Sequence, residues 1–98
     1  MTLTDRQKRH LRGLGHHLKP VVWVGQHGLS ESVMAEIGIA LDSHELIKVK
    51  IAAERDERRQ IAAEICAQTT AVLVHSIGQM IILFRRNSQK PKVALPSS

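Results

Sequence analysis

The stretch VVWVGQHGLSESVMAEI, residues 21–37, places a strand pattern directly before a helix pattern. Its first four residues are apolar and mostly β-branched, which is typical of a short strand. Ser30 is a good helix N-cap, and apolar residues recur with helical spacing as far as Leu41, so we expect a helix that ends near Ser43. Between the two patterns lies GQHG, residues 25–28. The fold therefore contains a strand that passes through a glycine turn into a helix.

Another helix is expected before this strand. Thr4 and Gln7 form a capping-box pattern, and leucines at positions 11, 14 and 18 predict an amphipathic helix that ends between Gly15 and Leu18. The cationic residues of this helix lie on the side opposite the leucines. Pro20 ends the helix and precedes the strand.

Three further β segments and a helix are expected after the quoted stretch. ELIKVKIAA, residues 45–53, alternates apolar residues with Lys48 and Lys50, which indicates a strand buried on one face. Asp56 is a suitable N-cap for a third helix. AVLVHSI and MIILFRR then flank Gly78-Gln79, a two-residue hairpin signal.

The expected order of elements is α-β-α-β-α-β-β, in which βαβ crossovers are followed by a hairpin. This order predicts an α/β fold with a mixed four-stranded sheet and helices packed on it. A chain of 98 residues has room for a single domain, residues 1–98, with a core from about residue 3 to residue 86. Residues 87–98 are polar and contain two prolines, so we expect a loosely ordered basic tail.

The charge of the chain indicates a polyanionic partner. Lys and Arg number 14 against 9 Asp and Glu, which gives a net charge of +5 and a pI near 10.0. The excess lies at the two ends, because residues 1–19 hold five basic groups against one acid and residues 85–98 hold four against none. The chain lacks a signal-peptide pattern and an apolar run of about 18 residues, so we expect a cytoplasmic protein that binds no membrane.

The GQHG turn is the most specific local feature. Glycine lets the backbone approach a ligand, and the amides at a helix start favour an anion, so Gly25, Gln26, His27 and Gly28 are expected to hold a phosphate. His27 can also donate a hydrogen bond to it. The alternative is a plain turn that uses glycine for its geometry alone. The turn lacks the third glycine of a dinucleotide loop and the Gly-Lys-Ser/Thr of a P-loop.

A second feature is a set of cations that come from separate elements. If they converge, they form a surface that follows a phosphate backbone. The set comprises Lys8, Arg9, Arg12, Lys19, Lys48, Lys50, Arg85 and Arg86. The two aromatic residues, Trp23 and Phe84, both lie in strand patterns that we interpret as core, so base stacking on the sheet is not expected. Recognition should then depend on the backbone and shape of folded RNA.

Neither an enzyme nor a metal site is indicated by the sequence. The six histidines include no pair in an H-x-x-x-H frame, and no nucleophile, base and orienting group can be assembled. Cys66 is the single cysteine, so it forms no intramolecular disulfide, and its place on an apolar helix face predicts an inert core residue. We therefore predict no catalytic residue, no metal ligand, no cofactor and no small-molecule substrate.

A family resemblance is carried by three stretches, QKRHLRGLGHHLKPVVWVGQHGLSESV, HELIKVKI and GQMIILFRR. In this order and spacing they resemble the bacterial YhbY proteins, which consist of a single CRM domain (chloroplast RNA splicing and ribosome maturation). The resemblance spans about residues 3–95. It implies a fold like that of the C-terminal domain of translation initiation factor 3, RNA binding, and association with the precursor of the large ribosomal subunit. By position, the family's GxxG loop falls on residues 25–28.

These observations together predict a monomeric, non-enzymatic protein that holds structured ribosomal RNA of the large-subunit precursor and assists ribosome assembly. The alternative is a basic adaptor that docks on an acidic protein without binding RNA. An architectural DNA binder is a third reading, for which the sequence shows no recognition-helix signature.

Overall fold

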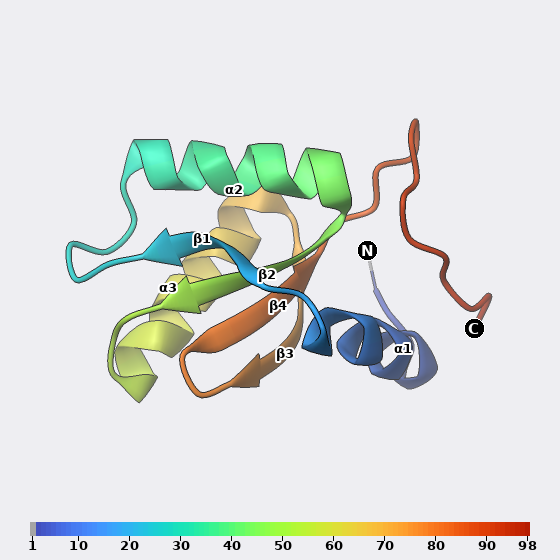
Figure 1. Ribbon diagram of the computed structural model, residues 1–98, viewed down its shortest axis with the longest axis horizontal. Helices are drawn as coiled ribbons and strands as arrows, with labels where there is room; N and C mark the ends of the chain where they lie inside the picture. Colours follow the sequence, from blue (N-terminus) through green and yellow to red (C-terminus); the bar gives the residue numbers. More distant parts are fainter. Residues whose placement is uncertain (1) are drawn as a thin grey trace.

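The computed structural model describes residues 2–98, in which three helices and four strands follow the predicted order. Figure 1 shows the helices packed around a twisted sheet, with both termini at the same end of the molecule. The elements are α1 (Asp5–His16), β1 (Pro20–Val24), α2 (Glu31–His44), β2 (Leu46–Ile51), α3 (Arg55–Thr69), β3 (Val72–Ile77) and β4 (Met80–Phe84). None of the helices in residues 2–98 combines the length and the apolar composition that crossing a bilayer requires.

The sheet is mixed, as predicted, with the strand order β1-β2-β4-β3. β1 and β2 are parallel and are joined through α2, whereas β4 pairs antiparallel with both β2 and β3. The β3–β4 hairpin therefore inserts its second strand between β2 and β3. Its turn requires glycine, because Gly78 has a φ of +55°.

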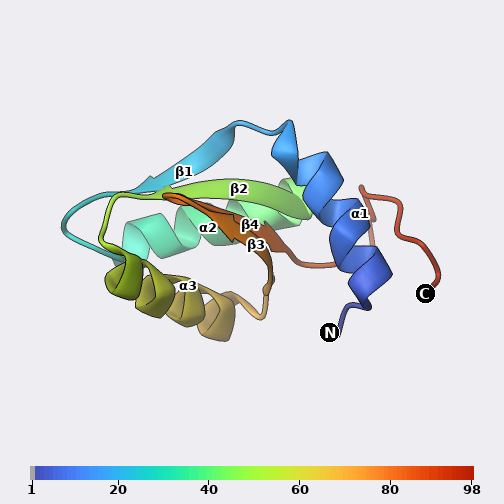
Figure 2. The ribbon, with the colours of Figure 1, turned by 90° about the horizontal axis from the view of Figure 1, so that it is seen from below.

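The two faces of the sheet are covered differently. α2 and α3 pack on one face, where Val24, Val49 and Leu83 belong to the larger core cluster (Figure 2). On the opposite face, a smaller cluster joins Leu11 of α1 to Ile82 and Phe84 of β4. α1 therefore covers one end of this second face and leaves the rest of it without a helix.

α1 approaches the sheet closely through a glycine. A Cβ atom built on Gly15 would lie 2.8 Å from Cγ2 of Ile82, so this position has no room for a larger residue. Leu11 is fully buried at the same contact, whereas Leu14 and Leu18 remain 43% and 38% exposed. The predicted leucine stripe is thus only partly inside, because the helix meets the sheet along Leu11 and Gly15.

The N-caps confirm two predictions and correct a third. Thr4 and Gln7 form the predicted capping box at α1, and the Ser30 hydroxyl accepts a hydrogen bond from the Val33 amide at α2. Asp56, in contrast, does not cap α3. The N-cap residue is Glu54, whose side chain makes no capping bond, and Asp56 lies in the first helical turn, where its charge still suits the helix dipole.

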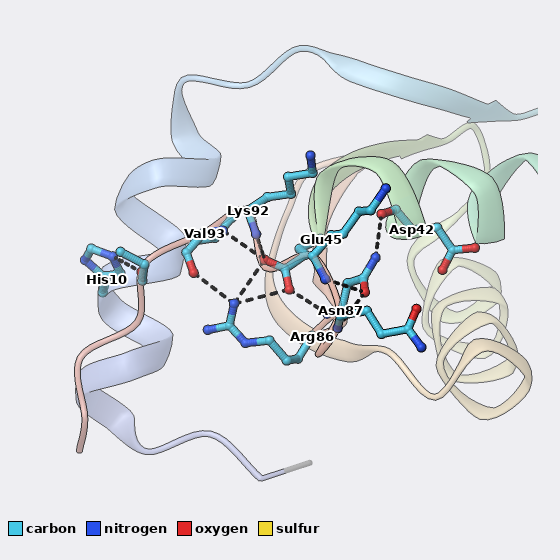
Figure 3. Close-up of polar contacts among 10 residues, drawn as sticks. His10, Asp42, Glu45, Arg86, Asn87, Lys92 and Val93 are labelled. Atoms are coloured by element: carbon cyan, nitrogen blue, oxygen red, sulfur yellow. Dashed lines mark hydrogen bonds and ion pairs between the residues drawn. The ribbon is translucent and has the colours of Figure 1, made fainter.

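The segment 87–98 is held against the domain, which corrects the expectation of a loose tail. It forms no helix or strand, yet the carboxylate of the buried Glu45 accepts hydrogen bonds from the backbone amides of Lys92 (2.6 Å) and Val93 (2.8 Å), and from that of Asn87. Arg86 donates to the same carboxylate at 3.0 Å and to the carbonyl of Val93 at 2.9 Å (Figure 3). The tail is therefore ordered by a buried acid that precedes β2.

Further contacts tie the end of the chain to α1. The Gln7 side chain donates to the carbonyl of Pro96 at 2.8 Å, and a ring nitrogen of His10 lies 2.9 Å from the carbonyl of Ala94. Val93 and Leu95 pack against the smaller core cluster. Local composition missed this arrangement because each contact joins residues that are far apart in the sequence.

Candidate nucleic-acid interface

The part of the second sheet face that α1 leaves uncovered presents one side chain from each strand. The strand register aligns Trp23, Lys50, Met80 and Ile77 across β1, β2, β4 and β3, and we call these four residues the open row. Trp23 is 65% exposed and Ile77 is 64% exposed. The neighbouring row, Lys48, Ile82 and His75, lies beside α1. The open row is thus an accessible apolar platform that contains a cation.

The exposure of Trp23 overturns its interpretation as core. Val22 and Val24 face the larger core cluster, with exposed fractions of 4% and 1%, so strand alternation turns Trp23 to the opposite face. Nζ of Lys50 lies 4.8 Å from the centroid of the indole ring, a cation–π contact. Phe84, in contrast, is fully buried, as predicted. The alternation in PVVWV could have placed Trp23 on the face opposite Val22 and Val24, but it could not show that this face stays uncovered there.

A groove of about 480 Å³ lies beside the contact of α1 with the sheet and brings predicted cations together. Arg9, Arg12 and Lys48 line it, along with His16 and His75. Lys48 also donates a hydrogen bond from Nζ to the carbonyl of His16, at 3.2 Å. The cationic face of α1 and a strand lysine therefore share one hollow, which adjoins the open row through Ile77.

Two more of the predicted cations lie next to this groove. Lys8 lines a smaller hollow together with Arg9 and Arg12, between α1 and Val74 of β3, and Asp5 lines it as well. Lys19, which precedes β1, shares a different hollow with Lys48. Lys48 thus lines one hollow with the cations of α1 and another hollow with Lys19.

The GQHG segment forms a tight turn whose residues 25–27 are exposed. The amide of Gly28 donates to the carbonyl of Gly25 at 3.0 Å, and Gly28 has a φ of +75°. A Cβ atom built on either glycine would meet nothing within 4 Å, so packing inside the protein does not require Gly25 to be glycine. The turn is open to an approaching ligand, although the Gly28 amide is already engaged.

The junction between this turn and α2 differs from the one that we expected for a phosphate site at the helix start. Leu29 and Ser30 separate the turn from the first helical residue, Glu31, and the Ser30 hydroxyl occupies the Val33 amide. Glu31 also places an acid in the first turn of the helix. The helix start is therefore less suited to an anion than the sequence pattern indicates.

α1 and the GQHG turn lie at opposite ends of the longest axis of the molecule, whose extent is 39 Å (Figures 1 and 2). They do not meet around one phosphate. β1 runs between them, and Trp23 precedes Gly25 by two residues. The groove, the open row and the turn thus follow one another along the molecule, and we call this succession the cationic track.

Arg85 and Arg86 are not part of the cationic track. Arg85 pairs with Asp42 at 2.7 Å and donates to the carbonyls of Gly38 and Thr69, whereas Arg86 binds the buried Glu45. Both guanidinium groups therefore bind acceptors of the domain itself, which include Asp42 of α2 and the buried Glu45 that follows this helix. The sequence could not show this, because the partners of Arg85 are between 16 and 47 residues away and Glu45 lies 41 residues from Arg86.

The remaining titratable groups are dispersed. Within residues 2–98, no three His, Cys, Asp or Glu side chains gather in an arrangement that could hold a metal ion. Cys66 is half-buried on α3, and burial raises the pKa of its thiol, which disfavours the nucleophilic thiolate.

Comparison with known proteins agrees with the fold and the earlier resemblance. Residues 3–85 match the sequence model of the CRS1 / YhbY (CRM) domain. The chain is 52% identical over 93 residues to "Probable RNA-binding protein PA4753" of Pseudomonas aeruginosa, covering 94% of this chain and 89% of that protein. It is 48% identical over 96 residues to a protein of Haemophilus influenzae named "RNA-binding protein", covering 97% and 96%.

A solved structure supports the same assignment. The fold is similar to the solution structure of SAV1595 from Staphylococcus aureus, with a TM-score of 0.84, 33% sequence identity, and coverage of 97% of this chain and 100% of that one. The architecture and the match over residues 3–85 define an α/β domain of the CRM class. The chain belongs to the CRS1 / YhbY (CRM) family.

Proposed function

We propose that this protein binds RNA through the cationic track and has no catalytic role. The observation that carries the proposal is the groove in which Arg9 and Arg12 of α1 meet Lys48 of β2. Cations from two elements that line one hollow can contact neighbouring phosphates of one RNA backbone. The names of the relatives from Pseudomonas aeruginosa and Haemophilus influenzae support RNA as the polyanion.

The proposed RNA is structured ribosomal RNA of the large-subunit precursor, and the proposed role is assistance in ribosome assembly. This finer assignment rests on the resemblance to YhbY proteins. The protein would act as a monomer in the cytoplasm and hold RNA segments in position by their backbone.

The proposed mechanism follows the track from one end to the other. The α1 cations and Lys48 bind phosphates at the groove, and Lys50 continues the contact across the open row. Gly25 lets the RNA backbone approach the turn closely, because no side chain stands there. His27 can donate to a phosphate at the same place. Arg85 and Arg86 are left out of this mechanism, since their guanidinium groups bind internal partners.

The salt dependence of RNA binding tests the proposed track. If six cations neutralise phosphates, log K against log salt should have a slope of roughly −4 to −5. The six are Lys8, Arg9, Arg12, Lys19, Lys48 and Lys50. A slope near −1 on folded ribosomal RNA would reject an extended contact.

The assembly role needs a separate experiment in cells. Cross-linking the bound RNA and sequencing it should recover large-subunit ribosomal RNA, and the protein should sediment with the precursor particle. Nuclease treatment before purification distinguishes the adaptor alternative, because an adaptor keeps its acidic protein partner when the RNA is destroyed. Retention of such a partner together with absence of cross-linked RNA would overturn the proposed function.

A further inference from the structure

We propose that Trp23 stacks on an unpaired RNA base, so that the protein recognises a single-stranded or looped segment beside the structured RNA held by its cations. The inference rests on the proposed RNA binding and adds a recognition site to it. The sequence interpretation had excluded base stacking, because it placed both aromatic residues in the core.

The position of Trp23 suits a base for steric reasons. It lies on β1, an edge strand, where α1 does not reach, and 65% of its surface is exposed. Exposed aromatic rings on a sheet are the platforms on which unpaired bases stack in single-strand binders, since every base has a π-face. The packing of the fold does not account for an indole ring that lies in water beside Lys50.

The charges around the ring favour a nucleotide over a protein side chain. Lys50 of β2 contacts the indole ring. Lys48 precedes Lys50 by two residues and lies on the same face of the sheet. In the open row and its neighbouring row, none of the seven residues is acidic. A base on Trp23 would therefore have cations for its flanking phosphates, and the glycine turn two residues further on would let the backbone pass.

The chain offers a direct optical reporter, because Trp23 is its single tryptophan. The probes are an unstructured RNA of about 12 nucleotides, within the site sizes of single-strand binders, and a blunt RNA duplex of equal length. Stacking of a base should quench the indole fluorescence. We expect quenching of the full-length protein by the single strand and little change on saturation with the duplex, whose bases are paired and inaccessible.

Two substitutions separate stacking from apolar contact. Trp23→Leu should weaken binding of the single strand by roughly 5- to 150-fold, the loss of one stacked base, and should weaken binding of the duplex by a much smaller factor. Trp23→Phe keeps a π-face and should retain most of the affinity. Ile39→Ala is the matched control, because Ile39 is 66% exposed on α2, away from the track. Urea midpoints establish that each variant is folded.

The outcomes distinguish this inference from the proposed function. If Trp23→Leu binds the single strand as tightly as the wild type, or if saturation leaves the fluorescence unchanged, base stacking is rejected. In that case salt-dependent binding of the duplex still supports the proposed function. If the wild type binds neither RNA, the proposed function itself fails and the inference fails with it.

Discussion

Lys48 of β2 donates a hydrogen bond to the backbone carbonyl of His16, the last residue of α1, at 3.2 Å. A cation at this position satisfies a carbonyl that the helix itself leaves unpaired, and it suits the negative end of the helix dipole. The same lysine lines the groove with Arg9 and Arg12. One side chain thus holds α1 on the sheet and supplies charge to the proposed RNA site.

Lys48→Ala should weaken RNA binding more than it weakens the fold. Removal of one phosphate contact should reduce the magnitude of the salt slope by about 0.7–0.9. The free energy of unfolding should fall by only about 0.5–1 kcal/mol, since the lost bond is partly solvated. Filter binding over a salt series and urea unfolding measure the two quantities. Lys90→Ala, in the exposed tail segment, is the control that should leave the slope unchanged.

Gly25→Ala should preserve the fold and reduce RNA affinity. The added methyl group meets no atom of the protein within 4 Å, and Gly25 is not among the glycines with positive φ. The loss should therefore come from the RNA that approaches the turn. Gly28→Ala adds backbone strain of about 1 kcal/mol, because Gly28 has a φ of +75°.

The control for the turn variants is Gly38→Ala on α2, where a Cβ atom also meets nothing. It should stabilise the helix by about 0.5–1 kcal/mol and leave RNA binding unchanged. If Gly25→Ala binds RNA as tightly as the wild type, the GQHG segment is a simple turn that does not contribute to RNA binding through a close backbone approach.

Gly15→Ala should destabilise the protein, although alanine is the better helix former. Its Cβ atom would lie 2.8 Å from Ile82, so α1 or the β4 side chain must shift, at a cost of about 1–3 kcal/mol. Gly13→Ala in the same helix meets nothing within 4 Å and should stabilise by about 1 kcal/mol. Urea midpoints of the two variants should therefore move in opposite directions. Stabilisation of both would contradict the close contact of α1 with the sheet.

Glu45 should make stability depend on pH in the acidic range. Burial raises the pKa of its carboxyl, but the amides of Asn87, Lys92 and Val93 and the charge of Arg86 lower it by more, so the net pKa lies below its ordinary value. The stabilisation is then fully present above the ordinary glutamate pKa of about 4.3, and it is lost as the pH falls through the lower folded value.

Glu45→Gln tests this assignment. It removes the charge that the three amides and Arg86 surround, and should cost about 2–4 kcal/mol at neutral pH. The unfolding free energy of the variant should also vary less than that of the wild type between pH 5 and pH 3, as urea titrations can measure. A Gln variant with wild-type stability at pH 7 would show that the tail is held by its apolar contacts instead.

Much of the fold could be predicted from the sequence, because the signals involved are local. The capping box at Thr4, the N-cap at Ser30 and the turn at Gly78 each act within a few residues, and they set the order of the elements. Asp56 shows the limit of such signals, since the helix begins one residue before it. The family could also be predicted from the sequence, because the resemblance depends on the identities of residues in three stretches and on the order of these stretches.

The candidate site was predicted in part. The cations of α1 and the strand lysines were named correctly as surface groups, and the structure shows Arg9, Arg12 and Lys48 lining one groove. Arg85 and Arg86 looked equivalent to the other cations in the sequence, but Arg85 pairs with Asp42 of α2 and Arg86 pairs with the buried Glu45. A count of charges cannot distinguish a free guanidinium group from one that is bound to an acid 41 or 43 residues away.

The sequence by itself determined the elements, their order, the glycine turn and the family, since these depend on periodicity and on contacts between near neighbours. Only the tertiary structure decided which surface stays open. α1 and the tail cover Phe84 and stop short of Trp23, and no pattern within a single strand records where a distant helix will pack. The exposure of a side chain depends on how the whole chain packs. The exposure of Trp23, the residue proposed to bind a base, could therefore be established only from the tertiary structure.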